Sequence, residues 1–136
     1  MKFNSLIPEL SVSDIKRSLE FYIDVLHFNL EYERPEKGFA FLSYQGSQLM
    51  LEEFNGNWVT EVPEYPFGRG INFSIETDEL IAIVERLKTF NYPIMLMPED
   101  AWYRKDDVLL GERYMLVQDP DGYFLRFQQD LGSKPA

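Results

Sequence analysis

One order of elements, a strand, a helix and three further strands, occurs twice in succession along this chain of 136 residues. In the first half, alternating apolar residues and turn signals predict strand, helix and three strands at 3–12, 14–26, 28–33, 38–44 and 48–54. In the second half, the same signals predict a strand at 71–76, a helix beginning at 77–78, and strands at 94–97, 111–119 and 122–128. Because the repeat is too long for a solenoid, it predicts one domain built of two modules.

The fold class that follows is α+β, with two βαβββ modules. In each module the three trailing strands should form a curved antiparallel sheet, with the first strand beside them and the helix over the outer face. We place the single domain at 1–136, its modules at about 1–54 and 70–130, and a linker at 55–69. The rings of Trp58, Tyr65 and Phe67 in the linker either pack against the domain or lie exposed in a ligand surface or subunit contact.

Composition excludes several classes of function. The chain has no cysteine, which excludes disulfides, thiolate nucleophiles and thiolate metal sites. No apolar run approaches the roughly 20 residues of a membrane span, so we expect a soluble cytoplasmic protein. The net charge of −10 opposes a nucleic-acid partner and favours a cationic ligand. The alternative is that the acidic surface only keeps the protein soluble.

No catalytic constellation is present in the sequence. The single histidine, His27, stands where a helix should end, and neither a phosphate-binding glycine loop nor a dinucleotide motif occurs. What remains is binding chemistry, in which aromatic rings and carboxylates together suit a large planar cation. The interleaved residues are Phe39, Phe41, Tyr44, Trp58, Trp102, Tyr103, Tyr114 and Phe124, with Glu9, Glu52, Glu53, Glu99, Asp100 and Asp106.

Trp102 is the first ligand-binding candidate because we predict that it lies in a polar loop, 98–111, between two strands. The alternative is a tryptophan packed over the edge of its own sheet. Glu9 and Phe41 are further candidates, with ordinary core packing as the alternative. In the strand at 48–54, alternation turns one carboxylate of Glu52 and Glu53 inward without deciding which.

Arg126 is an unusual residue on a face that also carries Phe124. It follows a Pro-Asp-Gly turn at 120–122, which leads into the last predicted strand. If this face lines a cavity, Arg126 is a site residue, and if the face meets water, Arg126 is an ordinary surface residue.

The order of four short motifs resembles the vicinal oxygen chelate superfamily, in the branch of bleomycin-resistance proteins and their dioxygenase-like relatives. These motifs are PELSVSDI at 8–15, SLEFY at 18–22, VLHF at 25–28 and DPDGY at 119–123. The resemblance implies a half-open, mainly antiparallel, eight-stranded barrel-like sheet. It also implies a homodimer, with modules paired within one chain or exchanged between two through a hinge near 55–70. His27 stands where the family usually has glycine.

The same resemblance implies where a metal would bind: at Ile7, Glu52, Gly70 and Arg126. Ile7 and Gly70 have no donor side chain and Arg126 is a cation, so only Glu52 could be a ligand. We therefore expect no metal, no cofactor and no enzymatic activity. Our hypothesis is that Arg126 neutralises Glu52, and the alternative is that Arg126 points outward without a particular partner.

Sequence alone leaves three functions open. The first is metal-independent sequestration of a cationic, partly planar ligand such as a bleomycin-type glycopeptide antibiotic, as the resemblance implies. The second is a metal-dependent lyase, isomerase or dioxygenase with an unrecognised site, and the third is a binding module for an endogenous metabolite. We expect no nucleic-acid or membrane partner. The predicted ligand-binding residues are Trp102, Glu9, Phe41, Glu52 and Arg126, with no catalytic or metal-binding residue.

Overall fold

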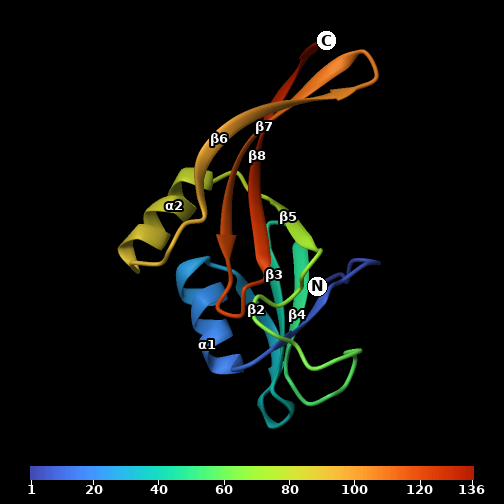
Figure 1. The fold of residues 1–136 in the computed structure, drawn as a ribbon, viewed down its shortest axis with the longest axis vertical. Coiled ribbons are helices and arrows are strands. Elements are labelled where there is room, and N and C mark those ends of the chain that lie inside the picture. Colours follow the sequence, from blue (N-terminus) through green and yellow to red (C-terminus); the bar gives the residue numbers. More distant parts are fainter. The chain divides into compact units, whose positions relative to one another are not determined.

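The computed structural model describes residues 1–136 and confirms the α+β class, with two four-stranded sheets that have the same topology (Figure 1). The first sheet has the order β1-β4-β3-β2. Its strands are β1 (Glu9–Val12), β2 (Asn29–Arg34), β3 (Phe39–Tyr44) and β4 (Ser47–Glu53). The second has the order β5-β8-β7-β6. Its strands are β5 (Asn72–Glu76), β6 (Leu96–Lys105), β7 (Val108–Gln118) and β8 (Phe124–Pro135). β1 with β4 and β5 with β8 are the parallel pairs.

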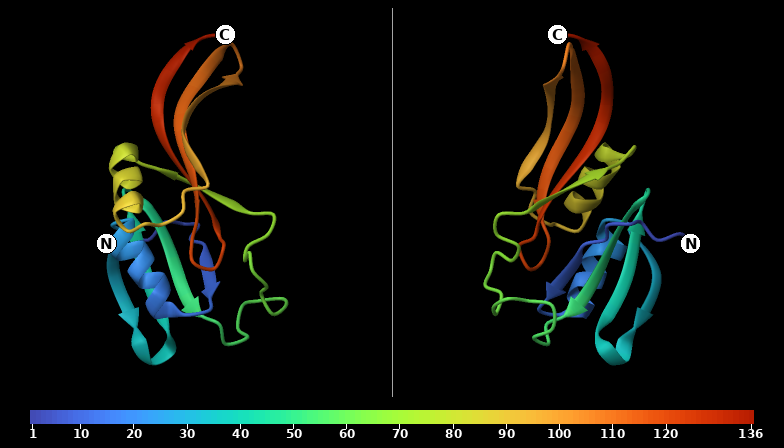
Figure 2. Two further views of the ribbon diagram at one scale, coloured as in Figure 1. Left: turned by 60° about the vertical axis from the view of Figure 1, so that its left-hand side comes forward. Right: turned by 90° about the vertical axis from the view of Figure 1, so that its right-hand side faces the viewer.

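The chain divides into two compact units. The first comprises Met1–Arg69 together with Asp119–Tyr123, and the second comprises Gly70–Gln118 together with Phe124–Ala136. The turn between β7 and β8 therefore packs with the first unit, although both strands belong to the second. Figure 2 shows the two sheets from two further directions.

The helical segment of the first unit begins as predicted. Asp14 caps α1 (Ile15–Leu19) by accepting a hydrogen bond from the Arg17 backbone N–H at 3.2 Å. The segment continues as a π-helix, η1 (Glu20–Val25), and ends with His27 at a φ of 64°. His27 thus adopts the left-handed conformation that its place at the helix end requires. A short 3₁₀ helix, η2 (Pro35–Lys37), joins β2 to β3.

The prediction of a first strand over 3–12 is too long, because β1 begins only at Glu9. Pro8 has no N–H to give to a sheet, and its carbonyl accepts from the Met50 N–H at 2.9 Å. Residues 1–7 lie outside any strand.

The predicted loop at 98–111 is wrong, since β6 and β7 form one long hairpin whose turn contains Asp106 at a φ of 55°. Pro98 had suggested a loop, but it falls at a register shift between Leu96 and Glu99, where no ladder donor is needed. The outer part of β6 is exposed and charged, so it lacks the apolar alternation that marks a half-buried strand. β8 also continues to Pro135, beyond the predicted end at 128.

Each unit has its own core between helix and sheet. Helix α2 (Leu80–Thr89) buries Leu80, Ile83, Val84 and Leu87. The fully buried side chains of the second sheet are Met115, Val117, Leu125 and Phe127. In the first unit, the buried residues include Leu10, Val12, Tyr22, Leu26, Leu42 and Leu51. None of the helices has the length and apolar character needed to cross a membrane.

Candidate functional site

Two side-chain contacts define which face of each sheet turns away from its helix. The Glu53 carboxylate accepts from the Ile15 N–H of α1 at 3.2 Å, so Glu53 faces the helix and Glu52 faces away from it. In the second unit, the Gln129 side chain accepts from the Leu80 N–H of α2 at 3.2 Å, so Gln129 faces the helix. Arg126 lies three residues earlier in the same strand, so it points to the opposite face, away from α2. The question of which glutamate turns from the helix is thereby answered in favour of Glu52.

We call the helix-distal side of the first sheet the acidic face. Strand register places its residues side by side: Glu9 lies opposite Met50, and Glu52 lies between Ser11 and Phe39. The residues that define the acidic face are Glu9, Tyr32, Arg34, Phe39, Phe41, Met50 and Glu52. Two of the predicted carboxylates and the predicted phenylalanine therefore share one surface within one unit.

An aromatic row crosses the acidic face. The Tyr32 and Phe41 rings stack with centroids 5.3 Å apart and an interplanar angle of 10°. Phe3, from the N-terminal segment, meets Phe41 edge-on at a centroid distance of 5.3 Å. Phe41 is consequently only 1% exposed. The surface open to a ligand is formed by Tyr32 and Phe3, so the predicted contact of Phe41 with a ligand stays a prediction that requires these rings to move.

On the acidic face, Glu9 lies in an environment that disfavours its negative charge. Burial raises the pKa of Glu9 above its ordinary value, the nearby Glu52 carboxylate raises it further, and the Arg34 guanidinium acts in the opposite direction. Because this face carries two carboxylates, Glu9 and Glu52, and one guanidinium, Arg34, its charges do not cancel. A ligand cation near Glu9 and Glu52 would oppose the repulsion between these two carboxylates.

Arg34 is a site residue that sequence reasoning missed. Its guanidinium carbon lies 4.0 Å from the Phe39 ring centroid and 5.7 Å from that of Tyr32. The predicted strand stopped at residue 33, and β2 ends one residue later. If the predicted strand had included residue 34, alternation would have placed Arg34 on the same face as Tyr32, which is the acidic face.

A depression of about 750 Å³ adjoins the acidic face in the first unit. Arg34, Phe39 and Glu52 of the acidic face line it, together with η2, Ile15 of α1, Glu53 and residues just after β4, whereas Glu9, Tyr32 and Phe41 do not. It is wide and open to solvent, and its size lies within the range of small-molecule sites. One end of the acidic face, at Arg34, Phe39 and Glu52, therefore borders a space that a ligand could enter.

Arg126 has a carboxylate partner within its own sheet. Its Nη1 lies 3.3 Å from Glu112 Oε1, and its Nε is buried without a hydrogen-bond partner. The alternative of an arginine without a particular partner is therefore wrong. Its predicted pairing with Glu52, which lies in the other unit, stays a prediction.

Trp102 lies within β6 and not in a loop. It pairs with Gly111, where a Cβ atom would lie 2.6 Å from the indole ring, and Lys134 Nζ lies 3.9 Å from the ring centroid. Since Glu112 is the next residue of β7 and reaches Arg126, Trp102 and Arg126 occupy opposite faces of the sheet. The tryptophan thus packs over its own sheet, as the alternative reading of its sequence held. It keeps 38% of its surface exposed, and a ligand contact there stays a prediction.

The linker aromatics divide between the two alternatives. Phe67 packs edge-on against Tyr123, with ring centroids 5.9 Å apart. Trp58 and Tyr65 are 85% and 62% exposed. The linker therefore has one ring anchored within the first unit and two rings available on its surface.

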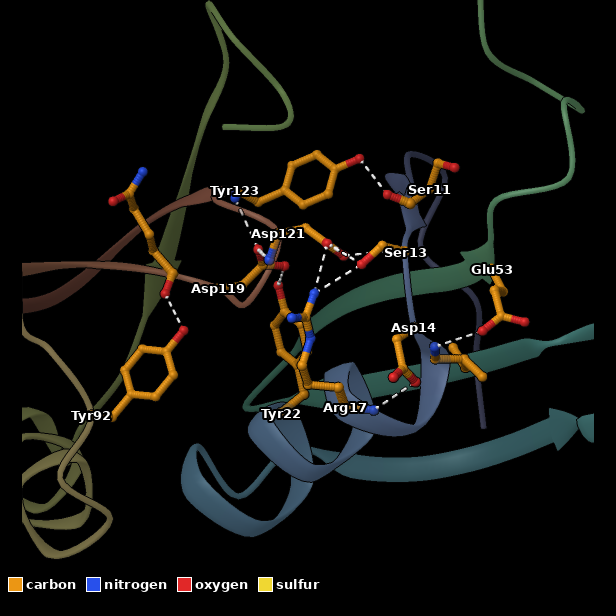
Figure 3. A network of polar contacts seen from close by, with 12 residues as sticks. Ser11, Ser13, Asp14, Arg17, Tyr22, Glu53, Tyr92, Asp119, Asp121 and Tyr123 are labelled. Atoms are coloured by element: carbon orange, nitrogen blue, oxygen red, sulfur yellow. Dashed lines mark hydrogen bonds and ion pairs between the residues drawn. The ribbon is translucent and has the colours of Figure 1, made fainter. Parts of the chain in front are cut away.

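The final turn forms a buried polar network with the first helix (Figure 3). Tyr22 donates its hydroxyl hydrogen to Asp119 at 2.8 Å, and the other Asp119 oxygen accepts from the Asp121 and Tyr123 N–H groups, each at 2.9 Å. Asp121 in turn accepts from the Ser13 N–H at 2.9 Å. Burial raises the pKa of Asp119 to about 6, against the effect of these donors. The network anchors the turn, and its oxygens are occupied by protein donors.

The residues present do not fit a divalent metal. The positions implied by family resemblance hold Ile7, Glu52, Gly70 and Arg126, which together supply one anionic ligand. No group of three or more His, Cys, Asp or Glu side chains gathers closely enough in the structure to hold such an ion. Glu9 could join Glu52, but two carboxylates remain fewer ligands than such a site needs. Metal sites in proteins normally provide at least three protein ligands, so this donor set is insufficient.

Comparison with known proteins supports the same kinship over nearly the whole chain. The family model described as "Glyoxalase/Bleomycin resistance protein/Dioxygenase superfamily" matches residues 3–127. The chain is 29% identical over 132 residues to a lactoylglutathione lyase of Haemophilus influenzae, covering 92% of this chain and 91% of the relative. It is 29% identical over 140 residues to a bleomycin resistance protein of Geobacillus stearothermophilus, covering 93% and 97%. Relatives of both kinds therefore match at the same identity.

Among solved structures, TioX from Micromonospora sp. ML1 has the same fold. It aligns with a TM-score of 0.73 at 17% identity, covering 95% of this chain and 100% of that one. At this identity the likeness concerns the fold alone.

Proposed function

The chain belongs to the glyoxalase/bleomycin resistance protein/dioxygenase superfamily, and we propose that within it this protein is a metal-independent binding protein of the cytoplasm. Its ligand is a cationic, partly planar molecule such as a bleomycin-type glycopeptide antibiotic, which it sequesters without chemical change. The ligand lies on the acidic face, against Glu9 and Glu52. We further propose a homodimer, with modules paired within one chain or exchanged between two.

The observation that supports this proposal most directly is the placement of Glu9 and Glu52 beside aromatic rings on one face. The Glu52 carboxylate raises the pKa of Glu9, and a ligand cation on the same face would act in the opposite direction. Tyr32 and Phe3 offer flat surfaces on the same face as the acids. Stacking, cation–π attraction and charge pairing are thereby available at one place to a planar cation.

A lyase, isomerase or dioxygenase is the alternative that the lactoylglutathione lyase relatives favour. Such a function needs a metal site, for which the donors described above do not suffice. Metal retained by the purified protein, and removable by a chelator with loss of activity, would support the alternative. A binding module for an endogenous metabolite would use the same acidic face, with a different cation.

The test is calorimetric titration of a bleomycin into the wild-type protein and matched variants. We expect one drug per chain, and an affinity weakened about 30- to 100-fold in the Glu9→Gln/Glu52→Gln variant, since a lost charge contact costs about 2 kcal/mol or more. The control is Glu112→Gln in the second sheet, which should change affinity less than about threefold. Equal losses in the two variants, or no heat with wild-type protein, would contradict the proposal.

Acidity and Trp102 provide two further readouts of the same titration. Binding should weaken as the pH falls through the raised pKa of Glu9, because a protonated carboxyl no longer attracts a cation. Trp102→Ala, which sequence reasoning predicts to weaken binding, decides whether Trp102 contacts the ligand. Unchanged affinity in this variant would remove Trp102 from the site.

A further inference from the structure

Arg34 occupies a position on the acidic face that resembles a bound cation. Its guanidinium lies 4.0 Å from the Phe39 ring centroid and also reaches Tyr32, whose ring is tilted by 38° to that of Phe39. Its charge acts on Glu9, as a ligand cation would. Phe39 is paired in register with both Arg34 and Glu52, so ring, cation and carboxylate lie in one row across the sheet.

The contacts that hold Arg34 are weak enough to exchange. None of the four ion pairs of the structure includes Arg34. The side chain is exposed and lines the depression next to Glu52. A ring contact of an exposed cation is worth about 0.5–1 kcal/mol, which a ligand with one better contact exceeds.

The shape of this position favours one class of cation. A guanidinium is flat and weakly hydrated, so it lies against an aromatic ring and keeps its edge free for a carboxylate. An ammonium ion is compact and strongly hydrated, and it loses more hydration at the same place. A position that already holds a flat cation against two rings, on a face with two carboxylates, should therefore accept other flat cations.

We propose that Arg34 is an internal ligand of the acidic face, which a bound molecule displaces, and that the face selects planar delocalised cations such as guanidinium and amidinium groups over ammonium ions. This inference rests on the proposed function and assigns to it a ligand class and a specificity-determining residue. Arg34 limits the affinity of those cations whose flat group takes its place against the rings.

The experiment compares benzamidine, a planar amidinium on a ring, with benzylamine, an ammonium on the same ring, by NMR titration. Removing Arg34 in Arg34→Ala should tighten benzamidine binding about tenfold relative to wild type, equivalent to about 1.4 kcal/mol, and benzylamine binding less than about threefold. The matched control is Lys88→Ala, which removes an exposed positive charge in the last turn of α2, in the other unit. It should change neither affinity by more than about threefold.

Two outcomes would overturn the inference. One is that Arg34→Ala binds benzamidine no better than wild type, and the other is that both probes gain equally, which would reduce Arg34 to a general charge. The Arg34→Ala/Glu9→Gln variant should lose the gain, because the carboxylate that receives the cation is then neutral. The amide spectrum of each variant reports whether it is folded.

A ligand-free measurement separates this inference from the proposed function. Carbon NMR of the Glu9 carboxyl should give a higher pKa in Arg34→Ala than in wild type, since Arg34 is the neighbour that lowers it. If a bleomycin fails to bind while benzamidine gains in Arg34→Ala, the proposed function fails and the role of Arg34 stands. If a bleomycin binds and neither the Glu9 pKa nor benzamidine affinity responds to Arg34→Ala, the proposed function stands and the role of Arg34 fails.

Discussion

Equivalent rows of four residues cross the helix-distal faces of the two sheets, and the rows carry opposite charges at the same place. The first row, from β1 through β4 and β3 to β2, is Ser11, Glu52, Phe39 and Arg34. The second, from β5 through β8 and β7 to β6, is Ser74, Arg126, Leu116 and Leu96. Glu52 and Arg126 are thus counterparts, as their places on the last strand of each module had suggested.

The difference teaches that a repeated topology does not repeat a site. In the second row, Arg126 has its carboxylate partner, Glu112, within the same sheet. In the first row, Glu52 lies near another carboxylate, Glu9, and Arg34 compensates the pair only in part. One face is neutralised internally, whereas the other retains negative charge that a ligand can use.

The largest expected difference between the rows concerns packing. Phe39 is 5% exposed and supports Arg34, whereas its counterpart Leu116 is half-buried. Phe39→Ala should lower the free energy of unfolding by about 3–5 kcal/mol and Leu116→Ala by about 1–2 kcal/mol, because the cavity left by a fully buried ring is larger. Urea unfolding followed by circular dichroism measures both. Equal losses would mean that the two faces are packed alike.

A second difference should appear as pH dependence of opposite sign. The pKa of Asp119, raised from 3.8 to about 6, makes its stabilising contribution complete below pH 3.8, and this contribution is lost as the pH rises through 6. About 2 pKa units correspond to about 3 kcal/mol. In the second unit, Arg113 lowers the pKa of Asp100, so its contribution is present above pH 3.8 and is lost as the pH falls through the lowered pKa.

Unfolding free energies measured between pH 3 and 8 for wild type, Asp119→Asn and Asp100→Asn separate these contributions. Asp119→Asn should abolish the loss between pH 4 and 7, at the cost of hydrogen bonds to Tyr22 and the turn N–H groups. Asp100→Asn should alter only the acid end, and slightly, because its ion pair is exposed. A wild-type stability that is flat from pH 4 to 7, or unchanged by Asp119→Asn, would refute the assignment.

A third prediction tests where Trp102 lies in the second sheet. Gly111→Ala places a Cβ where the indole ring now lies, 2.6 Å away, and should cost about 1–3 kcal/mol because the ring must shift. Trp102→Leu removes the obstacle, so the double variant should be less destabilised than the sum of the single ones. Strict additivity of the two substitutions would show that the ring and Gly111 are not in contact.

The smallest predicted effects are the couplings between two charged residues within the same sheet, one pair in each unit. A double-mutant cycle of Arg126→Met and Glu112→Gln should give an attractive coupling of about 0.5 kcal/mol. A cycle of Glu9→Gln and Glu52→Gln should give a repulsive coupling of similar size, because these neighbours carry like charges. Couplings of the same sign on both sheets would remove the electrostatic contrast between them.

Much of the fold could be predicted from local patterns. The alternation in β3 and β4, the helix cap at Asp14 and the left-handed His27 each depend on near neighbours in the chain, which the sequence displays directly. The hairpin of β6 and β7 could not, since its exposed residues carry no apolar period. Pro98 and the acids after it indicated a loop, whereas pairing with β7 made them a strand.

The candidate site was predictable only in part. Within each strand, successive side chains point to opposite faces, so the side of each residue relative to its neighbours could be predicted. Strand register then brings Glu9, Glu52 and Phe41 to one face. Arg34 was missed by a strand boundary one residue short, and Trp102 was placed in a loop for want of a visible period. Strand boundaries and cross-strand neighbours depend on pairing partners far along the chain.

By itself, the sequence determined the repeated order of elements, the family, and the lack of donors at three of the four implied metal positions. These depend on residue type and local spacing. The tertiary structure decided which glutamate faces away from the helix, that Arg34 shares the face of Glu9 and Glu52, that Arg126 pairs with Glu112, and that Phe3 covers Phe41. Each of these depends on side chains brought together by strand register and by the path of the N-terminal segment, and contacts between distant residues leave no local pattern in a single sequence.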